Sequence, residues 1–286
     1  MPGVSAIQRL MKILDGKKLA DKILLDIKKQ VAGMKRKPVL AMILVGDDPA
    51  SAIYVSRKGI FCENAGMGSK TYILPAKTSG KNLAELIEKL NKDKNITAIM
   101  VQLPLPKHID RNKIIERIDP RKDADCLHPL NFGRFVQGGE DYSVVAPATP
   151  LGIIKLLEEY KIPIEGKNAV VVGRSNIVGK PIAQFLLNRD ATVTICHRHT
   201  KNLANITHKT DILVVAVGKK NLIKAGMVKK GAVVIDVGVN RVGKKLYGDV
   251  DFPTVSKKAS FITPVPGGVG PITIAMLLWN TVKLTK

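Results

Sequence analysis

Residues 169–181 read AVVVGRSNIVGKP, and this stretch decides the fold. Four apolar residues predict a buried strand that ends at Gly173, and a helix is expected to begin near Gly179. Glycine lets the chain turn sharply and lets its backbone approach a ligand closely. A strand, a tight loop and a helix start whose free amides face an anion are typical of dinucleotide sites. Because Ser175 replaces the middle glycine of the usual G-x-G-x-x-G pattern, the loop alone is a weak indication.

Basic residues strengthen that interpretation. Arg174 lies inside the loop, where a guanidinium can hold a phosphate through two hydrogen bonds. The next predicted strand, 192–196, is followed by a turn that contains Arg198 and Thr200 but no acidic residue. Enzymes that use NAD usually carry Asp or Glu here for the ribose hydroxyl, so a basic turn favours the 2′-phosphate of NADP. The alternative is that both arginines are ordinary surface residues.

Strands and helices alternate on both sides of this stretch, which predicts βαβ units and mainly parallel sheets. We expect an α/β protein with two domains, the second Rossmann-like, and a C-terminal helix that returns to the first domain. The first domain is expected over 1–149 plus 272–286, and the second over 150–271. The predicted strands are 38–45, 71–74, 96–103, 169–172, 192–196, 212–216 and 233–237. The predicted helices are 19–33, 50–65, 83–90, 112–118, 150–160, 180–188 and 272–284.

The composition limits the class of protein. With 286 residues, 45% of them hydrophobic, the chain is long enough for two packed domains. No apolar run reaches the ~18 residues that a membrane helix needs, and 1–10 do not resemble a secretion signal, so we expect a loose N-terminal extension and a cytoplasmic location. The three widely spaced cysteines are expected to be reduced thiols, and no metal site is predicted.

The net charge of +22 indicates an anionic partner. Nucleic acid is one candidate, and an anionic cofactor with an acidic substrate is another. Aromatic residues make up only 4% of the chain and do not alternate with basic ones, so base stacking is not favoured. A solvated basic surface without a specific partner is the simplest alternative.

Residues that fit catalysis lie in the first half of the chain. Tyr54 and Lys58 are four apart on a predicted helix and therefore share a face. A desolvated lysine loses pKa and can transfer protons, while tyrosine offers a ring for stacking. Gln102 ends a predicted strand, where it can orient a water or hold the lysine amine. Each residue also has a structural explanation, as part of an amphipathic helix surface or as a turn-capping glutamine.

Two loops complete the set of candidate site residues. Asp125 can accept two hydrogen bonds from an amino-heterocycle, although Asp123 and Asp125 also suit a turn, and His128 is interpreted as structural. Residues 263–273 contain three prolines and three glycines, which predicts a stiff loop with an exposed backbone and one cis X-Pro bond. Such a loop fits close contact with a flat ligand or a plain interdomain linker.

The order of these motifs resembles the methylenetetrahydrofolate dehydrogenase/cyclohydrolase family over nearly the whole chain from about Met11. The motifs are Tyr54-x-x-x-Lys58, Val101-Gln102-Leu103-Pro104, Lys122-Asp123-Ala124-Asp125, Gly173-Arg174-Ser175-x-Ile177-Val178-Gly179-x-Pro181 and Pro264-Val265-Pro266-Gly267-Gly268-Val269-Gly270-Pro271. The chain departs from the family at Cys126, where glycine is usual after the aspartate, and at Ala148, where cysteine is usual.

The resemblance implies a function. It implies oxidation of 5,10-methylenetetrahydrofolate with NADP and hydrolysis of the methenyl product to 10-formyltetrahydrofolate, in a cytoplasmic homodimer that serves one-carbon metabolism and purine biosynthesis. Lys58 would be the key catalytic residue, oriented by Gln102, and Tyr54 would stack on the folate. The folate would be held by Asp125, Pro266, Gly267, Gly268 and Pro271. The cofactor would be held by Gly173, Arg174, Ser175, Ile177, Arg198 and Thr200.

Three alternatives remain open at this point. A family member could retain only one of the two activities, which separate assays of hydride transfer and methenyl hydrolysis would show. A basic nucleic-acid-binding regulator on a Rossmann scaffold would bind nucleic acid in a salt-sensitive way without folate turnover. A nucleotide-sensing module without catalysis would not need Lys58.

Overall fold

The structure is a computed structural model that describes residues 11–138, 145–243 and 245–285. These residues form two compact units. The three-stranded unit comprises residues 18–152 and 272–286, and the six-stranded unit comprises residues 1–17 and 153–271, each within its described part. The extension expected over 1–10 lies outside the described residues.

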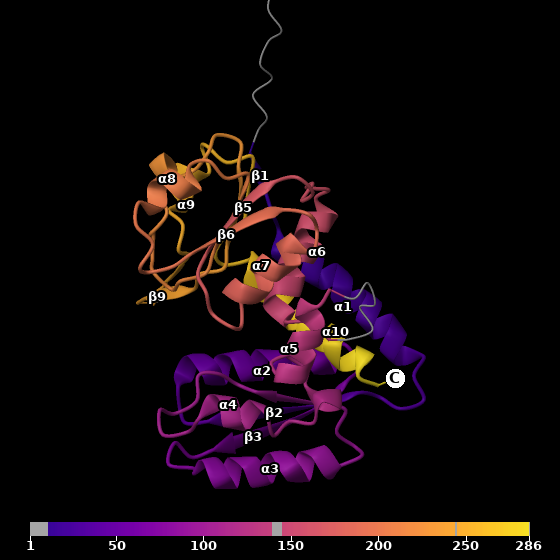
Figure 1. Ribbon diagram of the computed structural model, residues 1–286. Coiled ribbons are helices and arrows are strands. Elements are labelled where there is room, and N and C mark those ends of the chain that lie inside the picture. Colours follow the sequence, from indigo (N-terminus) through magenta and orange to yellow (C-terminus); the bar gives the residue numbers. More distant parts are fainter. Residues whose placement is uncertain (1–10, 139–144, 244, 286) are drawn as a thin grey trace, which may run out of the picture. The chain divides into compact units, whose positions relative to one another are not determined.

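The three-stranded unit is built on a parallel sheet in the order β3-β2-β4 (Figure 1). Its strands are β2 (Val39–Val45), β3 (Gly68–Leu74) and β4 (Ala98–Val101). The central strand β2 is a continuous apolar run, because helices cover both faces of the sheet. Helix α2 packs on one face, and α3 with α4 packs on the other, against Ala41, Ile43 and Val45 (Figure 1).

The helices of this unit begin where the sequence provides caps. Helix α2 (Pro49–Asn64) follows Asp48, whose carboxylate accepts a hydrogen bond from the Ser51 amide, with proline in the first turn. Helix α3 (Gly80–Lys92) is capped by Ser79 in the same way. The shorter elements of this unit are α4 (Arg111–Ile115), η1 (Pro120–Lys122) and α5 (Pro129–Val136).

The six-stranded unit holds a parallel sheet in the order β1-β11-β8-β7-β5-β6. Its strands are β1 (Lys12–Ile13), β5 (Asn168–Val172), β6 (Thr192–Cys196), β7 (Ile212–Val215), β8 (Val233–Asp236) and β11 (Phe261–Ile262). A separate antiparallel hairpin joins β9 (Asn240–Val242) to β10 (Lys245–Tyr247). The short helices are α7 (Gly179–Leu187), α8 (Leu203–Thr207), η2 (Ala225–Met227) and α9 (Phe252–Val255).

The chain passes from one unit to the other within three helices, α1 (Gly16–Ala32), α6 (Ala148–Glu159) and α10 (Val269–Lys283). The last of these ends in the three-stranded unit, where the Asn280 amide donates to the carbonyl oxygens of Ala124 and Ala146 at 2.8 and 2.7 Å. The expected α/β fold, with a C-terminal helix that returns to the first domain, is thereby confirmed.

Several details differ from the sequence-based expectation. Residues 11–17 belong to the six-stranded unit, because β1 pairs with β11 at the edge of that sheet, and residues 150–152 belong to the three-stranded unit. Helix α5 was not among the predicted helices. All three cysteines are free and buried. None of the helices in the described parts of the chain combines the length and apolar character that a membrane span needs.

Candidate active site

Lys58 and Gln102 form the centre of the candidate active site. Lys58 lies in α2, and Gln102 directly follows β4. The Lys58 ammonium donates to Oε1 of Gln102 at 2.9 Å and to Sδ of Met100 at 3.2 Å. Burial lowers the pKa of Lys58, and the carboxylate of Asp125 partly opposes this shift. The amine of Lys58 therefore releases its proton more readily than usual, and it is hydrogen-bonded to Gln102, the residue that the sequence analysis proposed as its partner.

The Gln102 amide is held in one orientation. Its backbone N–H donates to the Ile43 carbonyl at 2.8 Å, which continues the ladder between β4 and β2. Its side-chain Nε2 donates to the Leu103 carbonyl at 2.7 Å, so Oε1 points to Lys58. Met100 was not predicted as a neighbour of Lys58. Because alternate residues of a strand face the same side, its position two residues before Gln102 is the signal that could have found it.

Asp125 supplies a carboxylate near this lysine. Its side chain is partly buried, and among the described residues nothing donates a hydrogen bond to it. Burial raises the pKa of Asp125 to about 6, the charge of Asp123 adds to the shift, and Lys58 opposes it. A carboxylate that is close to a cation and carries no internal hydrogen bond is available to a polar ligand.

Asp123 has a structural role instead. Its two carboxylate oxygens accept from the amides of Leu127 and His128 at 3.2 and 2.9 Å and from Asn131 at 3.1 Å, which is the turn role left open for it. The expected structural role of His128 is confirmed, because its Nδ1 caps α5 by accepting from the Leu130 amide at 3.1 Å.

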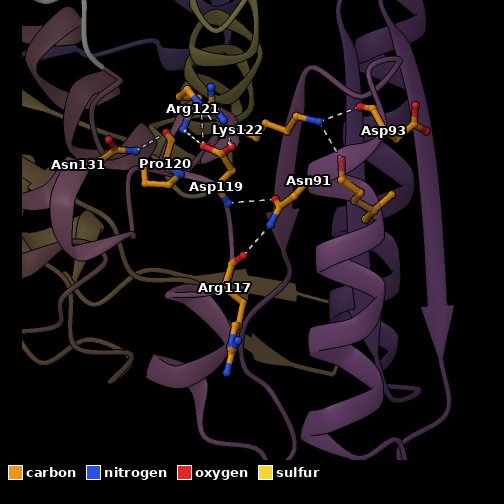
Figure 2. Close-up of polar contacts among 9 residues, drawn as sticks. Asn91, Asp93, Arg117, Asp119, Pro120, Arg121, Lys122 and Asn131 are labelled. Atoms are coloured by element: carbon orange, nitrogen blue, oxygen red, sulfur yellow. Dashed lines mark hydrogen bonds and ion pairs between the residues drawn. The ribbon is translucent and has the colours of Figure 1, made fainter.

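The segment before Asp125 is anchored to the end of α3, as Figure 2 shows. The Asn91 side chain donates to the Arg117 carbonyl at 2.7 Å and accepts from the Asp119 amide at 3.0 Å (Figure 2). Lys122 donates to two carbonyls at the end of α3, those of Leu90 and Asp93, both at 2.8 Å (Figure 2). These contacts anchor residues 117–122, which lead into Asp125, to the end of α3.

Tyr54 lies one helical turn before Lys58 on α2, as predicted. Its side chain is 38% exposed. An exposed tyrosine ring on the same helix face as a buried amine is available for stacking on a flat ligand.

The dinucleotide loop connects β5 to α7. Gly173 adopts a φ of +134°, and a Cβ at this position would lie 2.4 Å from the Ala216 carbonyl oxygen. A Cβ at Gly179 would lie 2.3 Å from the Gly173 carbonyl oxygen, so the loop leaves no room for a side chain at either glycine. Arg174, Ser175 and Ile177 are exposed.

One expectation about this loop is wrong. The backbone amides at the start of the helix were expected to be free for an anion. In the structure those of Val178 and Gly179 donate to the Ser175 hydroxyl oxygen, at 3.2 and 3.3 Å, because the serine that replaces glycine folds back over the turn. Ser175 thus stabilises the loop from within, and the exposed Arg174 remains as its charged group.

The basic turn after β6 lies beside this loop, since the Gly173 amide donates to the Cys196 carbonyl at 2.9 Å. Thr200 closes the turn by accepting from the His197 amide at 2.9 Å. Arg198 is exposed, and its Nε contacts the His199 ring nitrogen at 3.0 Å. No acidic side chain occurs between Cys196 and Thr200.

The proline- and glycine-rich loop belongs to the six-stranded unit up to Pro271. The Val265–Pro266 bond is cis, which confirms the expected cis bond in this loop. Gly267 has a φ of +100°, and a Cβ at Gly268 would lie 2.5 Å from the Pro264 carbonyl oxygen. The loop is tightly folded, and only glycine fits at these two positions.

Comparison with known proteins gives a consistent result. Residues 14–125 match the model for the catalytic domain of tetrahydrofolate dehydrogenase/cyclohydrolase, and residues 147–286 match the model for its NAD(P)-binding domain. The chain is 59% identical over 280 residues to the bifunctional protein FolD of Nitratiruptor sp., and the match covers 96% of this chain and 98% of that protein. The chain belongs to the tetrahydrofolate dehydrogenase/cyclohydrolase family.

Solved structures of the family agree with this assignment. The crystal structure of the bifunctional FolD enzyme from Campylobacter jejuni has a TM-score of 0.93 at 50% identity, and covers 96% of this chain and 98% of that one. The Trypanosoma brucei methylenetetrahydrofolate dehydrogenase-cyclohydrolase, solved with NADP cofactor and an inhibitor, has a TM-score of 0.93 at 38% identity, and covers 96% and 97%. Gly173 and Arg198 fall within the match to the NAD(P)-binding domain of the family.

Proposed function

We propose that the protein oxidises 5,10-methylenetetrahydrofolate with NADP and hydrolyses the methenyl product to 10-formyltetrahydrofolate. The observation that carries the proposal is the half-buried pair of Lys58 and Gln102, whose Nζ and Oε1 atoms lie 2.9 Å apart close to the carboxylate of Asp125. Both domains of the family are present in one chain, which supports both activities.

The three-stranded unit would bind the folate. Asp125 would accept hydrogen bonds from the amino-pterin edge, and the exposed ring of Tyr54 would stack on the flat part of the substrate. We also assign Pro266, Gly267, Gly268 and Pro271 to substrate binding, because their loop has a bare backbone. The large positive net charge would favour the acidic tail of folates.

The six-stranded unit fits a dinucleotide. The loop at Gly173 and Gly179 has the close backbone packing that a pyrophosphate requires, and Arg174 with Arg198 would neutralise the phosphates. Bound NADP supplies a hydride acceptor for the substrate's methylene carbon. The protein's contribution to this step is alignment, since the nitrogen lone pairs of the substrate stabilise the methenyl cation.

In the hydrolysis step Lys58 would manage the proton. A water adds to the methenyl carbon and loses a proton, which the neutral Lys58 amine accepts. The bond from that carbon to N5 then breaks, N5 takes a proton, and the formyl group remains on N10. Of the two protons of the water, one ends on N5 and one is released. Gln102 keeps the amine pointed at the reacting water by accepting its hydrogen bond.

Mixing the protein with methylenetetrahydrofolate and NADP, and following reduced cofactor and formyl product together, tests the proposal. We expect both to accumulate in step. If reduced cofactor accumulates but formyl product forms no faster than without the protein, only the dehydrogenase activity is present. If neither product accumulates, the proposal is contradicted. The same proposal includes what else the resemblance implies, namely a homodimer, a cytoplasmic location and a role in purine biosynthesis. The last of these fits a product that donates formyl groups.

A further inference from the structure

The loop after β7 lies at the switch point of the six-stranded sheet. In the order β8-β7-β5-β6 the chain runs from β5 outward to β6, and from β7 outward in the opposite direction to β8. Ligands of open α/β sheets bind beyond the carboxyl ends of the strands at such a point. The contact of Gly173 with the Ala216 carbonyl places the start of the β7 loop directly against the dinucleotide loop.

A fully buried carboxylate holds this loop. One carboxylate oxygen of Asp249 accepts from the consecutive amides of Val217 and Gly218, at 2.7 and 2.9 Å. Its other oxygen accepts from the Asn240 side chain at 2.8 Å. Within the described residues no cation forms an ion pair with Asp249, so backbone and amide N–H groups stabilise its charge.

A second buried carboxylate fixes Asp249 itself. Asp236, at the end of β8, accepts from the amides of Gly238, Asp249 and Val250 at 3.0, 2.9 and 2.9 Å. A Cβ at Gly248 would clash with the Asp236 carboxylate, and a Cβ at Gly238 would lie 2.2 Å from the carboxyl carbon of Asp249. The two aspartates are therefore enclosed by backbone on both sides.

Stability alone does not account for this arrangement. Burial raises the pKa of Asp236 to about 6, the backbone hydrogen bonds of Val250, Asp249 and Gly238 oppose this shift, and the charge of Asp249 adds a smaller increase. Burying a carboxylate therefore has a cost here that the hydrogen bonds do not fully offset. Such groups are often retained where they fix one conformation at a functional site. The conformation fixed here is that of Val217 and Gly218, where the loop turns with a φ of +68° at the glycine.

We propose that Asp249 is a positioning residue for the nicotinamide half of the dinucleotide, through its hold on the backbone of Val217 and Gly218. This inference rests on the proposed function. The adenosine half belongs beside β6, at Arg198, because the two halves of a dinucleotide lie on opposite sides of the switch point. The loop after β7 then faces the other mononucleotide.

The test compares two ligands, NADP and adenosine 2′,5′-bisphosphate, which carries only the adenosine half. For Asp249→Ala we expect the dissociation constant of NADP to rise about tenfold, while that of the bisphosphate stays within about twofold of the wild-type value. Methenyl hydrolysis should stay near the wild-type rate. If the substitution loosens the unit in general, the binding of both ligands should weaken equally, and that result would overturn the proposal. Unchanged binding of NADP would also overturn it.

Asp211→Ala is the matched control. Asp211 is also a carboxylate of this unit that accepts from a backbone amide, that of Asn168 at 3.0 Å, and it pairs with Lys229 at 2.6 Å, but it lies at the amino edge of β7. It should lower the melting temperature without changing either dissociation constant.

A second variant covers the case in which Asp249→Ala does not fold. Gly218→Ala leaves Asp249 intact and has open space for its Cβ, but strains the loop at positive φ, so it should reproduce the selective loss of NADP. Equal loss of both ligands in Gly218→Ala would also overturn the proposal. Wild-type protein that binds neither ligand would contradict the proposed function, and this inference with it.

Discussion

The Lys58 ammonium donates a 2.9 Å hydrogen bond to Oε1 of Gln102, in an environment that lowers the pKa of the lysine. An amide oxygen stabilises an ammonium without adding a charge. The pair therefore keeps the amine oriented while burial brings its titration closer to neutral pH.

Replacement of Gln102 by glutamate should move the pH profile of methenyl hydrolysis. A carboxylate at this distance favours the protonated amine, so the pKa of Lys58 should rise by about 1 unit or more. Because the neutral amine is the proposed base, the rising limb of the rate should shift to higher pH by the same amount. Steady-state rates between pH 6 and 10 measure this shift. An unchanged profile with an intact fold would separate Gln102 from proton transfer.

Asp125→Asn should change how stability depends on pH. The pKa of Asp125 is raised to about 6 from an unfolded value near 3.8, so the folded state binds this proton more tightly. The contribution of this proton to the free energy of unfolding is fully present below about pH 4 and is lost as pH rises through 6. Asparagine does not titrate and so lacks this loss. The free energy of unfolding of the variant, relative to that of the wild type, should therefore increase by on the order of 1–2 kcal/mol between pH 4.5 and 7.5. Denaturant unfolding at both pH values provides the measurement, and a constant difference would contradict the shift.

Cys126 has the backbone conformation of a glycine. Its φ is +55°, and its side chain is fully buried. Glycine adopts such a conformation without strain. Cys126→Gly removes the strain and loses the packing of the thiol, so the free energy of unfolding should stay within about 1 kcal/mol.

Cys126→Val serves as the opposite case, because a β-branched residue at positive φ should destabilise the protein by about 2 kcal/mol or more. Chemical denaturation of both variants ranks them. Equal stability of the two would show that the backbone conformation at this position is not strained.

Arg198→Ser should reduce the preference for NADP. The Arg198 side chain is exposed beside the dinucleotide loop. The turn that contains it has no acidic residue that could bind a ribose hydroxyl. We expect kcat/KM for NADP to fall about 10- to 100-fold and that for NAD to change little. Arg241→Ser, on the β9–β10 hairpin, is the control. A wild-type enzyme that works faster with NAD would refute the role given to Arg198.

The sequence predicted the regular elements well where local signals are strong. Asp48 and Pro49 marked the start of α2, and the apolar runs marked β2 and β5. The two-residue strands β1 and β11 have no such signal, because their pairing joins segments about 250 residues apart, and this is why residues 11–17 were assigned to the wrong unit.

The candidate site shows a similar division. The pairing of Lys58 with Gln102 followed from a helix face and a strand end, both of which are local patterns. Asp236 and Asp249 were missed. Asp236 lies within the predicted strand 233–237, and Asp249 follows a glycine, which in a sequence indicates a turn. Only the packed backbone shows that both are buried. Ser175 was predicted at the cofactor, but its contacts with Val178 and Gly179 depend on a loop geometry that spacing does not define.

The central claim is that the Lys58 amine handles the proton of methenyl hydrolysis, and Lys58→Met tests it most directly. Methionine fills the buried space without a titratable group, so the melting temperature should stay close to that of the wild type. Arg57→Met, an exposed neighbour on the same helix, is the matched control. We expect the rate of methenyl hydrolysis to fall by a factor of about 100 or more in Lys58→Met and to remain unchanged in Arg57→Met. Hydrolysis at the wild-type rate by folded Lys58→Met would contradict this account.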